Sequence, residues 1–306
     1  MSDMAASMNS ARLNAPPAPR PRRRRKGLAR LITRTTPVTW LVFLATLLTL
    51  LAAAAGPALV PFDPDAQTLL ARLRPPLGFE RAMVSHPFGT DELGRDMLSR
   101  TLHGLRLTLL IALTGSVISL VVGVLAGIVA GYLRGPVPAF IMALVDIQLA
   151  VPFTLIALLV VAIFGNALPV LIAVIGLSGW EVYARVVRAQ VLTVSRQPFV
   201  EAARAAGASH LRILIRHVLP NVISPVIVVW TMTFSALILL ESSLSFLGLG
   251  VQPPTATLGS MVGSGRDYLA TNPWIALVPS VAIMFVSLLV LLIGDWLRDA
   301  LDVKLK

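Results

Sequence analysis

Very few residues in this chain have the types and spacing that catalysis requires. The sequence Gly176–Gly179 reads G-x-S-G, which could make Ser178 the nucleophile of an intramembrane hydrolase. A serine nucleophile needs a histidine base within hydrogen-bond reach. The four histidines all lie outside the long apolar runs, at His86, His103, His210 and His217. We therefore interpret Ser178 as a small packing residue and expect no catalytic residue in the chain.

Metal and nucleotide chemistry are equally poorly supported. The chain contains no cysteine, so thiolate metal sites and disulfides are excluded. Neither an H-E-x-x-H zinc motif nor a G-x-x-x-x-G-K-[ST] phosphate-binding loop occurs. The lysines are Lys26, Lys304 and Lys306, and none follows a glycine-rich loop. We expect no metal site and no cofactor-binding site in this chain.

Composition places the chain in a membrane. Hydrophobic residues make up 56% of the 306 residues, charged residues 13%, and the mean hydropathy is +0.80. A membrane-spanning helix needs about 20 consecutive apolar residues. We predict an all-α polytopic protein with six transmembrane helices, over residues 38–60, 105–133, 140–164, 168–187, 222–240 and 274–293.

The distribution of Lys and Arg predicts the orientation. If the amino terminus is cytoplasmic, nineteen of the 26 basic residues lie on the cytoplasmic side, as the positive-inside rule requires. We therefore expect a multi-pass protein of a bacterial plasma (inner) membrane with both termini in the cytoplasm. The run Arg22–Lys26 is interpreted as a topology anchor that contacts anionic membrane lipid, and we expect no nucleic acid partner. The apolar run of the first span is too long for a cleaved signal peptide.

The stretch Glu201–Pro220, EAARAAGASHLRILIRHVLP, is a polar, alanine-rich interruption between apolar runs. Alanine strongly favours helix, and Pro198 suits a first helical position that places Glu201 in the first turn. Gly207 should end this helix, and Ser209 should cap a second helix that runs into the next span. The pattern predicts a slim helical elbow that projects from the membrane.

This stretch resembles the EAA motif of binding-protein-dependent ABC importer permeases. Glu201, Ala202, Ala203, Gly207, Leu219 and Pro220 match that motif, and His217 stands at its Ile, which is a packing position. The resemblance implies a type I ABC importer permease fold, in which the elbow docks into a cleft of a cytoplasmic ATPase. The expected ATPase-coupling residues are Glu201, Ala202, Ala203, Arg204, Gly207, Ser209 and Arg212.

Three further stretches resemble the C-type permease subunit of dipeptide, oligopeptide and nickel importers. They are residues 86–100 (HPFGTDELGRDMLSR), 241–262 and 294–306. The first should form an outer surface elbow in which Thr90 or Asp91 caps a short helix. We interpret this elbow as a bracket held by local ion pairs rather than as a direct contact for substrate or binding protein.

The resemblance also implies the partners. They are a B-type permease subunit that completes a heterodimer, two ABC ATPase subunits that bind ATP and Mg, and an extracytoplasmic substrate-binding protein. The expected organisation is a disordered basic tail (1–37), the first transmembrane helix (38–60), an extracytoplasmic segment (61–104), a permease core (105–295) that includes the coupling segment (195–219), and a cytoplasmic tail (296–306).

Within the spans, small residues recur every four positions from Gly115 to Gly131. Small residues at this spacing let helices approach closely, so Gly123, Gly127 and Gly131 are predicted helix-packing residues. Asp146 is costly inside a span; it either extends toward the interface or makes a helix contact, or it is a candidate for the translocation path. Pro152 can kink the third span, and Glu181 with Arg185 has the spacing of an ordinary ion pair on one helix.

Two other classes of membrane protein remain open. A secondary transporter usually has internal repeats and ionisable residues near the bilayer midplane, and apart from Asp146 the spans offer almost none. A purely structural membrane subunit would have no use for the Glu201 elbow. The substrate, among dipeptides, longer peptides, nickel chelates and related solutes, is not encoded in any pattern that we can identify.

Overall fold

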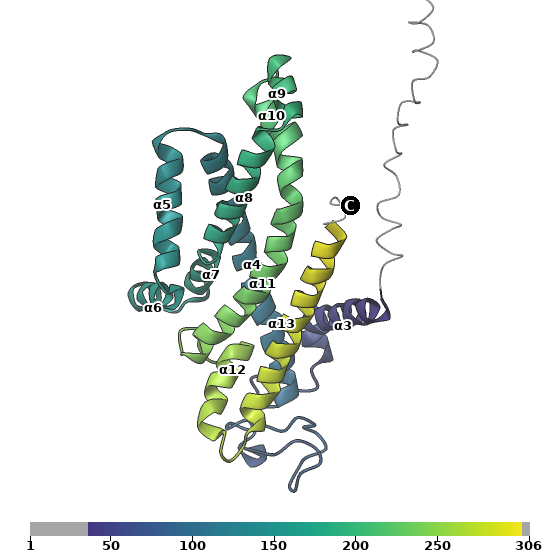
Figure 1. The fold of residues 1–306 in the computed structure, drawn as a ribbon. Coiled ribbons are helices and arrows are strands. Elements are labelled where there is room, and N and C mark those ends of the chain that lie inside the picture. Colours follow the sequence, from purple (N-terminus) through teal and green to yellow (C-terminus); the bar gives the residue numbers. More distant parts are fainter. Residues whose placement is uncertain (1–35, 302–306) are drawn as a thin grey trace, which may run out of the picture. The chain divides into compact units, whose positions relative to one another are not determined.

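The computed structural model describes residues 36–301. Residues 1–35, which hold the Arg22–Lys26 run and nearly all of the predicted basic tail, and residues 302–306 lie outside this range. Every regular element in the described range is a helix (Figure 1). The elements are α3 (Pro37–Leu59), η2 (Leu69–Ala71), α4 (Met97–Tyr132), α5 (Pro136–Ala150), α6 (Phe153–Phe164), α7 (Leu168–Gly176), α8 (Trp180–Ser195), α9 (Pro198–Ala205), α10 (His210–Ile213), η3 (Leu214–Val218), α11 (Leu219–Phe246), α12 (Leu258–Gly265), η4 (Arg266–Tyr268) and α13 (Trp274–Leu301).

The helices confirm a multi-pass membrane architecture. Five helical segments are long and apolar enough to cross a bilayer, over Pro37–Gly56, Met97–Tyr132, Leu168–Ser195, His210–Phe246 and Trp274–Leu301. A sixth span exists only if α5 and α6 together form one broken span. Several spans extend beyond their predicted limits, because polar residues at the helix ends continue the backbone hydrogen bonding after the apolar run stops.

The predicted third span is not one straight helix. α5 and α6 are bent by 93° at Val151 and Pro152. Pro152 has no N–H to donate and its ring blocks continuation of the preceding helix, so α6 starts anew immediately after it. The prediction of a kink at Pro152 was right in position, but the bend is a change of direction rather than a modest kink.

The predicted fourth span is broken as well. α7 ends at Gly176 and α8 begins at Trp180, with Gly179 at a φ of +84° that side chains disfavour. The break frees backbone carbonyls, and the single hydroxyl hydrogen of Ser119 on α4 is shared between two of them, at Gly176 (2.8 Å) and Ser178. A serine from a neighbouring helix thus satisfies carbonyl groups that lipid could not.

A seam of small residues joins α4 to α8. A Cβ added at Gly123 would lie 2.6 Å from the Tyr183 Cβ, and one at Gly127 would lie 2.7 Å from the Ala184 carbonyl oxygen. One at Gly131 would lie 2.8 Å from the Val191 Cβ. These distances are shorter than real Cβ contacts allow, so the two backbones approach closely only because these positions are glycine.

The long helices pack around α4 and α11, and α12 is an unpredicted short helix beside them. Thr257 caps α12 by accepting a hydrogen bond from the Ser260 N–H, and the Ser260 hydroxyl accepts one from the Thr257 N–H. The carboxy-terminal helix α13 continues past Ile293 through the start of the predicted tail to Leu301. The structure therefore has two recognisable ends, which we call the α9 end (with α9 and α10) and the α12 end (with α12 and the loop before α4) (Figure 1).

Candidate coupling segment and intramembrane polar cluster

The elbow at the α9 end has the predicted local structure. Pro198 occupies the first turn of α9, Glu201 lies in the same turn, and Gly207 follows the helix at a φ of +80°. The N–H of Ala208 donates to the carbonyl of Ala203 (3.1 Å) and the N–H of Gly207 to that of Arg204 (3.0 Å). This pair of bonds is the Schellman motif, which glycine favours because it tolerates the left-handed conformation.

The next helix also begins as predicted. The Ser209 hydroxyl accepts a hydrogen bond from the backbone N–H of Arg212 and caps α10. The chain then continues through the π-helical turn η3 into α11, so that residues 210–246 form one nearly continuous rod. His217 is half-buried with its ring centroid 5.9 Å from that of Phe199. The histidine therefore fills a packing position.

One fully buried side chain anchors α9. Val200 has no exposed surface and packs with valines and an isoleucine from α8, α10, η3 and α11. The rest of α9 points outward: Phe199, Glu201, Ala202, Arg204 and Ala205 are exposed, and Ala203 is partly covered. After Phe199, the exposed surface of α9 is consequently a narrow ridge of alanines that carries one carboxylate and one guanidinium.

A hydrogen bond ties the second half of the elbow to the end of α4. The ring Nδ1 of His210 lies 3.0 Å from the hydroxyl of Tyr132, and this hydroxyl also donates to the His210 carbonyl (3.2 Å). Since Tyr132 is the last residue of α4, the elbow is joined both to α8 and α11 and to the helix that carries the glycine seam.

Asp146 contacts α8 rather than standing alone. Its carboxylate lies 2.8 Å from the guanidinium of Arg185, and the two side chains are 66% and 56% exposed. The predicted pair between Glu181 and Arg185 on one helix was wrong, since Arg185 pairs across to α5 and Glu181 accepts from Gln148 (2.9 Å). Because α5 packs against α8, Arg185 lies closer to Asp146 of α5 than to Glu181 of its own helix, and Glu181 lies within hydrogen-bond distance of Gln148.

Gln148 and Trp180, which no sequence pattern singled out, complete a polar cluster between α5 and α8. Gln148 donates to the Leu177 carbonyl (2.8 Å) as well as to Glu181, and the indole N–H of Trp180 donates to the Gln148 side-chain oxygen. The signal was present, because Gln148 is a polar residue two positions after Asp146 in an apolar run. We refer to Asp146, Gln148, Trp180, Glu181 and Arg185 as the polar cluster.

Ser178 does not belong to a catalytic arrangement among the described residues. Its carbonyl accepts a hydrogen bond from Ser119. Three histidines are engaged elsewhere: His86 with Asp96, His210 with Tyr132 and His217 with Phe199. The described part of the chain also holds no group of three or more His, Asp or Glu residues suited to a metal ion.

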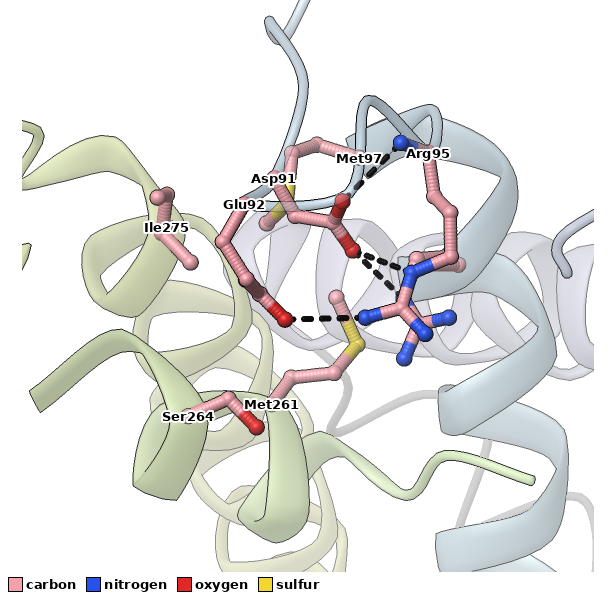
Figure 2. Close-up of a pocket in the computed structure, with 8 residues that line it drawn as sticks. Asp91, Glu92, Arg95, Met97, Met261, Ser264 and Ile275 are labelled. Carbon is pink, nitrogen blue, oxygen red and sulfur yellow. Dashed lines mark hydrogen bonds and ion pairs between the residues drawn. The ribbon is translucent and has the colours of Figure 1, made fainter. Parts of the chain in front are cut away.

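The elbow at the α12 end is held together by buried charges (Figure 2). The Arg95 guanidinium reaches between Asp91 (2.6 Å) and Glu92 (3.0 Å), and the Arg100 guanidinium also approaches Asp91 (3.4 Å). Asp91 is only 2% exposed. The local ion pairs expected for this elbow are therefore present, and they face Met261 of α12.

The predicted cap in this elbow was wrong by several residues. Asp96 caps α4 by accepting a hydrogen bond from the Ser99 N–H (2.7 Å), and its other carboxylate oxygen lies 2.9 Å from His86 Nδ1. Asp91 instead accepts hydrogen bonds from the N–H groups of Leu93 and Arg95 within a turn. Both aspartates fit cap and turn chemistry; Asp91 is engaged by the local pairs with Arg95 and Arg100, and Asp96 caps α4.

Comparison with known proteins identifies the family of this chain. Residues 123–306 match the family model described as "Binding-protein-dependent transport system inner membrane component". The chain is 44% identical over 260 residues to the di/tripeptide transport system permease protein DppC of Pseudomonas aeruginosa, covering 85% of this chain and 86% of that protein. It is 40% identical over 223 residues to the glutathione transport system permease protein GsiD of Shigella boydii, covering 73% and 74%.

A solved structure shares the fold. A chain of the MetNI methionine ABC transporter, in an inward-facing conformation, superimposes with a TM-score of 0.54 at 19% identity, covering 67% of this chain and 97% of that chain. At this identity the likeness concerns the fold alone. Since the family model covers more than half of the sequence and the relatives align over most of it, the chain belongs to the family of binding-protein-dependent transport system inner membrane components, the permease subunits of ABC importers.

Proposed function

We propose that this chain is a permease subunit of an ATP-driven importer of dipeptides or oligopeptides, and that α9 couples it to a cytoplasmic ATPase. The peptide substrate is supported by the names of the relatives, which describe di/tripeptide and glutathione transport. The coupling role is carried by one observation: α9 is anchored through Val200 while its alanines, Glu201 and Arg204 remain exposed.

Family membership implies a binding protein, a partner permease and an ATPase as components of the transport system. In the finer assembly that we propose, a B-type permease pairs with this chain and two ATPase subunits bind ATP and Mg. The α9 end, where Arg204, Arg212 and Arg216 lie, faces the cytoplasm, and the α12 end faces the binding protein. Both chain termini are cytoplasmic in this arrangement.

The proposed coupling follows from the shape and charge of α9. Alanine side chains keep the helix narrow enough to enter a groove, and the exposed Glu201 and Arg204 offer charges to its rim. ATP draws the two ATPase subunits together, and each carries its docked elbow with it. ATP can shift the equilibrium between the inward-open and outward-open states only by the difference in its binding free energy to the two states. An appreciable shift needs a difference of a few kcal/mol.

The test uses the reconstituted transporter with its binding protein in sealed vesicles. Glu201→Arg should leave membrane insertion intact and abolish ATP-driven peptide uptake, because a guanidinium replaces the carboxylate at the docking ridge. Glu80→Arg is the matched control, since Glu80 is also exposed and lies in the segment before α4. Wild-type uptake by Glu201→Arg would refute the docking role, and uptake driven by an ion gradient without ATP would overturn the proposed function.

A further inference from the structure

We propose that the Asp146–Arg185 ion pair is a transit site for zwitterionic peptides: Arg185 takes the substrate carboxylate and Asp146 takes its ammonium group. This inference rests on the proposed function, because it assumes that peptides pass along this face. Gln148, Trp180 and Glu181 are positioning residues that hold α5 against α8, so that the two charges face each other.

The polar cluster lies at membrane depth. Asp146 and Gln148 belong to α5, and the other three members belong to the candidate span Leu168–Ser195. At the level of Trp180, α8 packs on Gly123 of α4, which lies nine residues before the last residue of that helix. Nine residues correspond to about 14 Å along a helix. If that helix end lies at the interface, Trp180 is about 14 Å deep in a hydrocarbon layer about 30 Å thick. Arg185 lies nearer the α9 end, because its neighbours Ala184 and Val187 pack on Gly127, five residues or about 7.5 Å from the end of α4.

Charges within the hydrocarbon layer are costly where they face lipid. Both members of the Asp146–Arg185 pair are more than half exposed in the single chain, so water or protein must cover them in the membrane. The break between α7 and α8 lies beside the cluster, and side chains satisfy its carbonyls at Gly176, Leu177 and Ser178. Irregular backbone in a membrane is tolerated where protein buries it or where it lines a water-filled cavity.

The chemistry of the pair matches a zwitterion. When a peptide with a free amino and a free carboxyl terminus inserts between Asp146 and Arg185, each of the four charges keeps an opposite partner. An extended dipeptide spans about 7 Å at most, a gap that two exposed side chains with several rotatable bonds can open. Peptides of this size can therefore enter without leaving a charge unpaired in a medium of low dielectric constant.

The exposure of the Asp146–Arg185 pair also suits a site that a substrate binds only briefly. Both side chains are more than half exposed in the single chain, so a substrate can reach the two charges of the Asp146–Arg185 contact directly. By contrast, Gln148 is fixed by hydrogen bonds to Leu177, Trp180 and Glu181. The cluster thus combines a fixed frame with two charges that are free to exchange partners.

The test measures discrimination between peptide termini in the complete reconstituted transporter. Vesicles receive alanyl-alanine, its carboxyl-terminal amide or its N-acetyl derivative, each at the concentration that half-loads the binding protein. We expect the wild-type protein to translocate alanyl-alanine at least tenfold faster than either derivative. Arg185→Gln should lose the discrimination against the amide, and Asp146→Asn should lose the discrimination against the N-acetyl peptide. Arg134→Gln, an exposed arginine in the loop before α5, should retain both.

The outcomes separate this inference from the proposed function. If wild-type vesicles take up none of the three peptides with ATP present, the proposed function fails. If the wild-type protein transports alanyl-alanine but treats the derivatives equally, or if Arg185→Gln and Asp146→Asn keep the wild-type ratios, the transit site is refuted. A uniform loss of uptake at unchanged ratios would assign the pair to structural contact with the partner permease and would also overturn the inference.

Discussion

Gly207 offers the sharpest test of the coupling segment, because its cost on substitution is purely conformational. It follows α9 at a φ of +80°, and a Cβ added there would meet no atom within 4 Å. The Cβ of a valine at this position therefore meets no other part of the chain. It must instead either adopt a left-handed conformation or abandon the hydrogen bonds from Gly207 and Ala208 that close the helix.

The magnitude follows from the backbone. A side chain in the left-handed region costs roughly 1–2 kcal/mol, and a β-branched residue lies at the upper end of that range. α9 has eight residues and could not be stable alone, and its Val200 anchor contributes about 1.5–3 kcal/mol. The strain therefore removes a large part of what holds α9 in place and lowers the ratio of ordered to disordered elbow about 5- to 30-fold.

Hydrogen exchange and transport should report this loss together. In the reconstituted complex, Gly207→Val should lose amide protection over residues 198–208 while α4 and α11 keep theirs, and ATP-driven uptake should fall in proportion. Gly207→Asn should behave nearly as wild type, because asparagine tolerates the left-handed conformation. Unchanged protection and unchanged uptake in Gly207→Val would show that the ordered elbow is not what couples the ATPase.

Three other substitutions test the packing and the caps. Gly127→Ala places a Cβ 2.7 Å from the Ala184 carbonyl oxygen and should cost about 1–3 kcal/mol, seen as a lower melting temperature of the purified complex. An unchanged melting temperature would show that α4 and α8 can move apart to accept the extra methyl group without loss of stability. Val200→Ala removes two buried carbons, or about 1.6 kcal/mol, and should speed hydrogen exchange in α9 but not in α11; equal exchange in both would count against the anchor. Asp96→Ala loses the cap on the Ser99 N–H and should cost about 0.5–2 kcal/mol, whereas Asp96→Asn should melt close to wild type.

Local sequence chemistry predicted the elbow at the α9 end almost completely. Pro198, Gly207 and Ser209 act through the backbone of their own immediate neighbours, so a single stretch of sequence contains the whole cause. The lengths of the apolar runs likewise predicted the approximate positions of five spans, whereas the predicted sixth exists only if α5 and α6 form one broken span. The helix ends were less well predicted. Apolar composition indicates which residues contact lipid, but a helix continues for as long as its backbone hydrogen bonds do, which includes polar residues outside the membrane.

What could not be predicted depends on contacts between distant segments. Arg185 lies four residues from Glu181, yet it pairs with Asp146, 39 positions earlier, because α5 packs alongside α8. The break before Trp180 is stabilised by Ser119, whose hydroxyl comes from another helix. Neither partner is visible without the fold. The sequence showed only that Asp146 was costly in a span, which indicates a function or a contact without naming it.

The position of α8 links the two proposed sites. Its last residue, Ser195, leads into the elbow, and its first residue, Trp180, holds Gln148 in the polar cluster. A 16-residue helix is a rod of about 24 Å, stiffened by its backbone hydrogen bonds, and glycines of α4 hold it at close range. Under the proposed function, a force that displaces the elbow must therefore move Arg185 relative to α4 or α5. The substrate charges and the ATPase would then act on opposite ends of one helix, which explains how a chain that hydrolyses no ATP can still make substrate passage depend on it.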